Sequence, residues 1–174
     1  MGYEFDDAYP DDSYIWLADI LALEAMNSGN FGVGCILTDV KGNVVVQGHN
    51  EVFNPYFRSD RHGEMVVMDE LEDAHQHILN PGGFTLYTSL ESCPMCLIRM
   101  ITSGISRILH AAPDMEGGMV HKMKYLPQFW VDLVAGQVYS QAECSQELTN
   151  IANEIFLYNA DELKEKLNNR KALR

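Results

Sequence analysis

Four residues in two short segments have the types and spacing that suit metal-assisted catalysis. Residues 58–71 read RSDRHGEMVVMDEL and contain His62 and Glu64, and residues 89–100 read SLESCPMCLIRM and contain Cys93 and Cys96. Two thiolates and one imidazole form a ligand set that suits zinc and leaves the fourth tetrahedral position for water. A carboxylate two residues from a ligand reaches that water without binding the metal, so Glu64 is the candidate proton carrier.

Each segment taken alone has a simpler interpretation. A histidine and a glutamate two positions apart on a helix are usually a surface pair, and CxxC after a strand also occurs in thioredoxin-like redox proteins. The two segments together, each in a loop-to-helix or strand-to-helix context, favour a catalytic zinc site over either alternative.

The elements around these residues predict how they are brought together. Residues 62–78 and 93–104 both have helical patterns, and the second follows an extended stretch at 84–90. Each helical pattern starts at a candidate ligand. Residues three apart share one helix face, and the positive end of the helix dipole favours thiolates. We therefore expect two helix N-termini to meet at one metal ion.

The rest of the chain alternates helical and extended patterns. Further helical patterns occupy residues 13–29, 125–136 and 141–167, the last with a predicted break near Asn159. Further extended patterns occupy residues 31–39, 44–50 and 105–113, with 136–140 a weak candidate for a fifth strand. We expect an opening β-hairpin, then parallel pairing between strands that helices separate, in a single sheet with helices against it.

The motif His62-Gly63-Glu64, followed by CPMC at 93–96, resembles the H-x-E…P-C-x-x-C signature of the zinc-dependent cytidine and deoxycytidylate deaminase superfamily. The resemblance extends to FGVGCILTD, GHN at 48–50 and LYTSLESCPMC. It implies an α/β fold with three α/β/α layers, in which helices flank a mixed central sheet. Residues 1–174 would form one deaminase domain, with residues 122–174 as a helical C-terminal extension.

One residue departs from the family pattern. Ser92 stands where the family usually has a proline before the first cysteine. Because that proline shapes the loop and is not a ligand, we expect the zinc site to persist.

The resemblance also implies roles for individual residues. His62, Cys93 and Cys96 would hold one zinc ion per chain, and Glu64 would shuttle protons. Asn50 matches the asparagine that hydrogen-bonds the substrate ring, although asparagine is also an ordinary turn residue.

Three further residues are candidates for substrate binding. Phe31 either lines the pocket, as the resemblance suggests, or belongs to the core. Asp114 and Glu116 follow the fourth predicted strand, and loops at strand ends face the site in α/β folds. A solvated loop acid is an equally good interpretation of each.

Within the superfamily, the GHN, HGE and LYT features are most similar to the guanine deaminase and yeast-type cytosine deaminase branch. That likeness implies hydrolytic deamination of a small nucleobase-like ring, such as guanine, cytosine or an aminotriazine, to a carbonyl with release of ammonia. It also implies a homodimer. Two alternatives stay open: a tRNA-editing adenosine deaminase, and a zinc or redox module without hydrolase activity.

Composition limits the partners. The chain has 25 acidic and 12 basic residues, a formal net charge of −13, which repels polyanions and makes nucleic acid an unlikely partner. The locally basic residues 164–174 fit the polar face of a terminal helix. The N-terminus lacks the pattern of a secretory signal, and we expect no membrane segment. A cytoplasmic protein that binds a small molecule is the resulting expectation.

Overall fold

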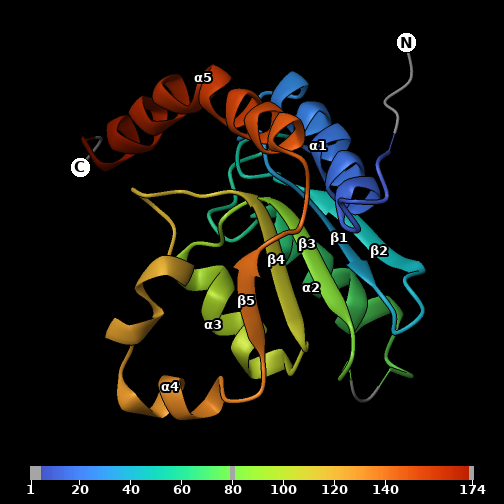
Figure 1. The fold of residues 1–174 in the computed structure, drawn as a ribbon. Helices are drawn as coiled ribbons and strands as arrows, with labels where there is room; N and C mark the ends of the chain where they lie inside the picture. The colour runs from blue at the N-terminus through green and yellow to red at the C-terminus, as the bar shows by residue number, and fades with distance from the viewer. Residues whose placement is uncertain (1–4, 79–80, 173–174) are drawn as a thin grey trace.

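The computed structural model describes residues 5–78 and 81–172 and has a five-stranded sheet with the strand order β2-β1-β3-β4-β5 (Figure 1). The strands are β1 Gly34–Thr38, β2 Val44–His49, β3 Thr85–Leu90, β4 Arg107–Ala112 and β5 Val138–Gln141. The helices are α1 Asp12–Asn27, α2 Gly63–Ala74, α3 Pro94–Ser103, α4 Gln128–Leu133, α5 Gln146–Ala172 and the 3-10 helix η1 Val120–Tyr125.

The sheet is mixed. Strand β1 pairs antiparallel with both β2 and β3, whereas β3 with β4 and β4 with β5 pair in parallel. The predicted hairpin and the parallel pairs β3–β4 and β4–β5 are present, but the parallel pair expected across α2 is not, because β3 pairs antiparallel with β1. The crossover through α2 places β3 on the far side of β1, so β2 and β3 run in the same direction without touching.

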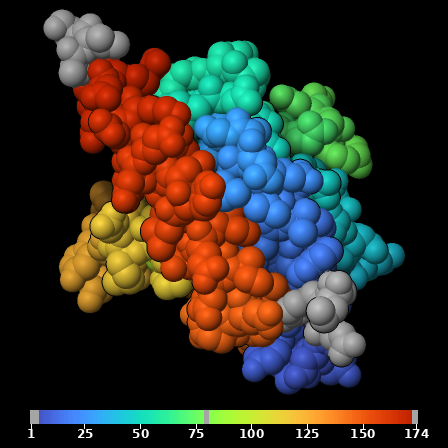
Figure 2. Space-filling view, turned by 90° about the horizontal axis from the view of Figure 1, so that it is seen from above, coloured from blue at the N-terminus to red at the C-terminus, as the bar shows by residue number. Residues whose placement is uncertain are grey.

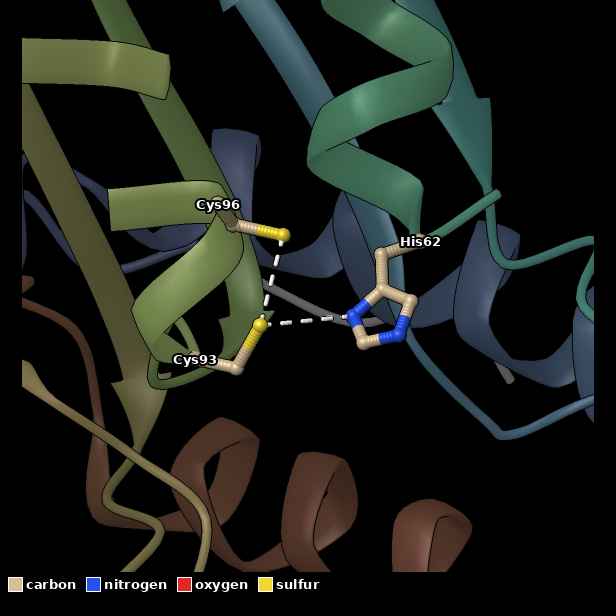
Figure 3. A group of neighbouring side chains, drawn as sticks. All are labelled: His62, Cys93 and Cys96. Carbon is tan, nitrogen blue, oxygen red and sulfur yellow. Dashed lines mark hydrogen bonds between the residues drawn. The ribbon is translucent and has the colours of Figure 1, made fainter. Parts of the chain in front are cut away.

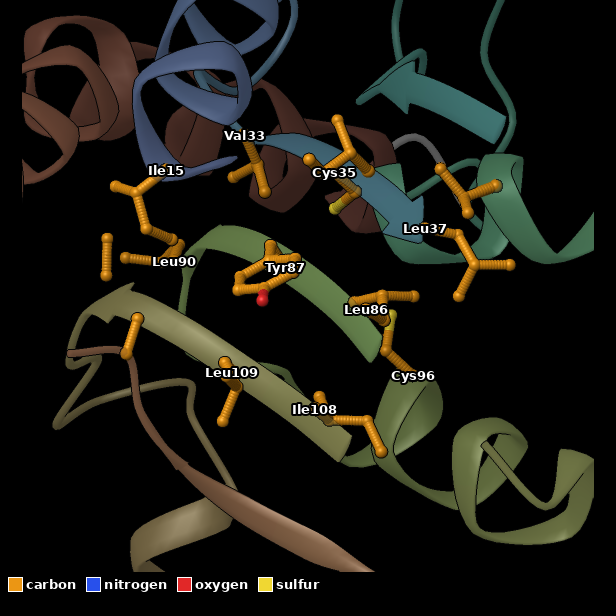
Figure 4. Packing of buried hydrophobic residues seen from close by; sticks show 14 of the residues in the cluster. Ile15, Val33, Cys35, Leu37, Leu86, Tyr87, Leu90, Cys96, Ile108 and Leu109 are labelled. Atoms are coloured by element: carbon orange, nitrogen blue, oxygen red, sulfur yellow. The ribbon is translucent and has the colours of Figure 1, made fainter. Parts of the chain in front are cut away.

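Helices cover both faces of the sheet, which gives the three-layer α/β/α arrangement. Helices α1 and α5 pack together over one face, and α2 and α3 lie on the other (Figure 1). All residues of β1 and β3 are buried, so these central strands show no alternation between buried and exposed positions. Their side chains, with those of β4, form the centre of the core (Figure 4).

The region after residue 122 is not only helical, because the weak strand candidate at 136–140 is confirmed as the edge strand β5. Helix α5 is continuous, so the predicted break near Asn159 is wrong. The Asn159 side chain donates a hydrogen bond to the Asn30 carbonyl oxygen at 3.0 Å instead of competing for the helix backbone. Among the described residues, no helix is both long and apolar enough to cross a membrane.

Two aspartates at the start of α1 hold the start of α5 in place. The backbone N–H of Glu143 donates to Asp11 Oδ2 at 2.8 Å, and that of Ser145 donates to Asp12 Oδ1 at 2.7 Å. The Asp11 carboxylate is engaged in this contact and therefore makes no side-chain capping hydrogen bond to α1. The two contacts fix where α5 begins and therefore how it crosses the top of the sheet.

Candidate active site

Three side chains from two helix N-termini converge at one point (Figure 3). His62 is the N-cap residue of α2, Cys93 is the N-cap residue of α3, and Cys96 lies one turn further on. Cys93 Sγ lies 3.5 Å from His62 Nδ1 and 3.6 Å from Cys96 Sγ. All three donor atoms lie within 4.8 Å of one another, which is the spacing of ligands around one metal ion.

Local sequence explains why the two helices meet here. A Cβ atom on Gly63 would lie 2.9 Å from Cys35 Sγ, so the first turn of α2 packs against β1 more closely than any larger residue allows. Pro94 occupies the first position of α3, where its fixed φ angle favours helix initiation directly after Cys93.

The two thiols are electrostatically different. The hydrogen bond with Cys96 is the main cause that lowers the pKa of Cys93 to about 4, and contact with His62 adds to it. The same bond and burial raise the pKa of Cys96 well above its usual range. Burial lowers the pKa of His62, but contact with Cys93 outweighs it and raises the value overall. The group therefore holds one thiolate readily, as a cation site requires.

Glu64 is a buried carboxyl in the first turn of α2, with 4% of its surface exposed. Burial raises its pKa, and the charge of Cys93 raises it further. The Ser92 hydroxyl has no partner at hydrogen-bond distance among the described residues, but it lies close enough to Glu64 to lower the pKa of that carboxyl. A carboxyl in this position can hold a proton nearer to neutral pH than an exposed one.

A cavity of about 220 Å³ opens above His62, Glu64 and Cys93. Phe31 and Phe156 line it, and their rings stack with centroids 6.3 Å apart. Phe156 and Leu167 belong to α5, so the last helix covers a site whose metal-ligand candidates lie far earlier in the chain.

Asn50 lines this cavity and is only 2% exposed. Its backbone N–H donates to the Val33 carbonyl oxygen at 2.8 Å, and its side-chain oxygen accepts from the Val52 N–H at 3.1 Å. These contacts fix the carboxamide, whose NH₂ group makes no hydrogen bond to any described residue. Asn50 therefore has an NH₂ donor available at this cavity.

The two predicted loop acids lie in different places. Asp114 lines the cavity, but its Oδ1 accepts hydrogen bonds from the backbone N–H groups of Glu116 and Gly117 and so holds the loop turn. The Glu116 side chain is 83% exposed, pairs with Lys164 at 2.9 Å and does not line this cavity.

Sequence reasoning missed Glu91, a 4% exposed residue in the cavity wall. Its Oε1 accepts hydrogen bonds from the backbone N–H and ring Nδ1 of His121, and its Oε2 accepts from the Asp114 N–H. Burial raises the pKa of Glu91, but these donors outweigh it and keep the value below the usual range. Glu91 ties the loop after β4 to the segment that carries Cys93, and its place next to the CxxC was a usable signal.

The cavity residues of α5 were also missed. Phe156, Lys164 and Leu167 line the cavity, and none of them was among the predicted site residues. Nothing in the local pattern of α5 identifies which of its faces meets a site formed by residues 62–96.

A sequence profile of the cytidine and deoxycytidylate deaminase zinc-binding region matches residues 9–112. The tRNA-specific adenosine deaminase of Bacillus subtilis is 32% identical over 108 residues, covering 62% of this chain and 65% of that protein. The chain thus matches less than two thirds of the length of that curated relative.

Solved structures of low identity share the fold. One comes from a study of A-to-I editing by tRNA:A34 deaminases at the wobble position, with a TM-score of 0.67 at 24% identity over 82% of this chain and 98% of that one. Another is guanine deaminase from Nitrosomonas europaea, with a TM-score of 0.62 at 15% identity over 89% of this chain and 95% of that one.

Proposed function

The chain belongs to the cytidine and deoxycytidylate deaminase family, and on that premise we propose that it is a zinc-dependent hydrolytic deaminase. The reaction consumes water, converts the exocyclic amino group of a small nucleobase-like ring to a carbonyl, and releases ammonia. Guanine, cytosine and aminotriazines are the candidate rings. The observation that carries the proposal is the convergence of His62, Cys93 and Cys96 with the buried carboxyl of Glu64 at one cavity.

The donor set fits one zinc ion per chain. One imidazole nitrogen and two sulfurs are ligands that zinc prefers, and three protein ligands are typical of catalytic rather than structural sites. When bound, zinc supplies a Lewis acid and makes water acidic near neutral pH.

The chain's own residues then do three things. The Glu64 carboxylate takes one proton from the attacking water and passes it to a ring nitrogen. It then takes the second proton from the hydroxyl now attached to the ring and passes it to the amino group, which leaves as ammonia. The Asn50 carboxamide donates a hydrogen bond that orients the ring. Phe31 and Phe156 supply aromatic surfaces, which suit a flat ring, and exclude water from it.

The test is ammonia release by zinc-quantified protein against guanine, cytosine, adenine, their nucleosides and aminotriazines. Release from a member of this panel, with one zinc per chain, supports the proposal. Protein that binds no zinc and releases no ammonia would instead favour a redox role for Cys93 and Cys96.

A second candidate is adenosine deamination in tRNA. The specific observation is the 108-residue match to the Bacillus subtilis tRNA-specific adenosine deaminase. Conversion of adenosine to inosine in an anticodon stem-loop, with no release from free bases, would favour this candidate. The net charge of −13 argues against a polyanion and makes it the second choice.

We further propose that the protein is a cytoplasmic homodimer, as the resemblance to free-base deaminases implies. Sedimentation velocity at micromolar concentration and localisation of a tagged chain check the two statements separately.

A further inference from the structure

The cavity at the metal-ligand group continues into a larger one. The second cavity has a volume of about 560 Å³ and shares five lining residues with the first, among them Asp114, Phe156 and Lys164. It lies between α5 and the loop after β4, and Figure 2 shows these two segments side by side. We call this second cavity the outer groove.

The outer groove has more room than a single ring needs. A ring whose amino group reaches His62, Cys93 and Glu64 occupies the inner cavity of about 220 Å³. Any substituent on the opposite side of that ring extends past Phe156 and Asp114 into the outer groove. The space therefore fits a substrate that is larger than a free base.

The charges of the outer groove restrict that substituent. Among the described residues, Asp114, Glu116 and Asp161 line it with one cation, Lys164, so this lining carries more negative than positive charge. Lys164 already pairs with Glu116 at 2.9 Å. Ionised carboxylates only accept hydrogen bonds, so they match hydroxyl and N–H donors and repel phosphate, which offers acceptors alone.

On the basis of the proposed deaminase function, we propose that the outer groove holds an uncharged, hydroxyl-bearing substituent of the aminated ring and rejects phosphorylated substrates. The carboxylates of Asp161 and Glu116 determine this preference for an uncharged substituent over a phosphorylated one. Asn153, which also lines the groove, adds an uncharged amide that both donates and accepts.

The experiment compares kcat/KM for a base, its nucleoside and its nucleoside 5′-monophosphate, in the cytosine and the guanine series. We expect the nucleoside to exceed the free base, and to exceed the monophosphate at least about fivefold at low salt. High salt should reduce the ratio of nucleoside to monophosphate kcat/KM, because screening weakens repulsion between exposed charges. A monophosphate that equals the nucleoside, or a free base that exceeds it, would overturn the proposal.

Substitutions on and off the groove test which residues cause the preference for nucleoside over monophosphate. Asp161→Asn combined with Glu116→Gln should reduce the preference for nucleoside over monophosphate several-fold. Glu162→Gln is the control, because Glu162 lies on the same helix but pairs with Lys166 at 2.7 Å and does not line the groove. If the double variant and Glu162→Gln changed the ratio of kcat/KM for nucleoside and monophosphate equally, a specific role for Asp161 and Glu116 would be contradicted.

A binding measurement separates this inference from the proposed function. Zinc-loaded Glu64→Gln protein, titrated calorimetrically with nucleoside and monophosphate, reports the preference of the groove without turnover. Binding that favours the nucleoside, in a wild-type chain that releases no ammonia, would retain the groove and reject the deaminase reaction. Ammonia release by the wild type, together with equal binding of nucleoside and monophosphate, would retain the deaminase reaction and reject the proposed role of the groove.

Discussion

Two buried carboxyl groups in this molecule share their exposure but differ in their surroundings. Glu64 and Asp19 are each 4% exposed, and burial raises the pKa of both, that of Asp19 to about 8. Glu64 lies beside His62 and Cys93 at a cavity. Asp19 lies in α1 near Cys144, and neither of its carboxyl oxygens has a hydrogen-bond partner among the described residues.

The difference shows that a buried acid with a raised pKa does not by itself indicate catalysis. At Glu64 the neighbours are metal-ligand candidates and an open space for a substrate. At Asp19 burial is the cause that raises the pKa, and the neighbour Cys144 is not a cation that could stabilise a carboxylate. We therefore expect Asp19 to stay protonated and to affect stability instead of turnover.

Loss of a metal ligand should produce the largest contrast between the two regions. Cys96→Ser replaces a soft sulfur by a hydroxyl that zinc binds poorly, so we expect both bound zinc and deaminase activity to fall below detection. Cys144→Ser, near Asp19, is the matched control and should keep one zinc per chain. Zinc is measured by mass spectrometry of the purified protein, and full zinc in Cys96→Ser would contradict the assigned ligand set.

Glu64→Gln and Asp19→Asn remove one buried carboxyl each at nearly constant volume. Removing the proton carrier should lower kcat about 10²- to 10⁴-fold while zinc stays bound. Asp19→Asn should keep kcat within about twofold, since Asp19 does not line the cavity. Steady-state ammonia release measures kcat for both variants. A comparable loss of kcat in the two would refute the conclusion that Glu64 is catalytic and Asp19 is not.

The sequence was sufficient to predict that the three side chains of the candidate metal site lie together, because each lies at the start of a predicted helix. His62 and Cys93 each start a helix, and Cys96 follows within one turn, so the periodicity of two short segments determines which way these side chains point. The same holds for the predicted end of α3 at Gly104, which adopts a φ of 79°.

The outer parts of the site could not be predicted because they depend on contacts between distant segments. Strand β5, which falls at the weak candidate 136–140, has four residues and none is fully buried, so its pattern is faint. Its place follows from backbone bonds such as Val138 N–H to the Ser106 carbonyl oxygen at 2.8 Å. Phe156 reaches the cavity because α5 packs against α1, β3 and β4, and Asp11 and Asp12 help to fix where this helix begins.

The raised pKa of Asp19 predicts how stability changes with pH. Its pKa is raised from 3.8 to about 8 in the fold, so the folded chain binds a proton more tightly than the unfolded chain between these values. The free energy of unfolding should therefore lose up to about 1.4 kcal/mol per pH unit as pH rises from about 4 to about 8.

Asp19→Asn should remove this dependence and be more stable than the wild type near pH 8. Urea denaturation at several pH values measures the difference, which should grow up to pH 8 and then level off. Glu24→Gln, on an exposed position of the same helix, also replaces one carboxyl group by an amide and should show no such trend. A difference between Asp19→Asn and wild type that does not vary with pH would show that Asp19 is ionised in the fold.

The smallest effect is expected at Ser92, the residue that stands in place of the usual proline. Its hydroxyl is buried and lowers the pKa of Glu64. Ser92→Ala should leave the free energy of unfolding unchanged or slightly raised. The reason is that a buried hydroxyl without a hydrogen-bond partner contributes little to stability.

The same substitution should lower kcat about two- to fivefold with little change in KM, as expected if the hydroxyl orients Glu64 through a weak contact of roughly 0.5–1 kcal/mol. Ser92→Thr keeps a hydroxyl and should restore most of the turnover. A purely structural role predicts the opposite order, in which Ser92→Ala loses stability and keeps kcat. Parallel denaturation and kinetic measurements on the two variants therefore decide whether this side chain serves the reaction or only the packing.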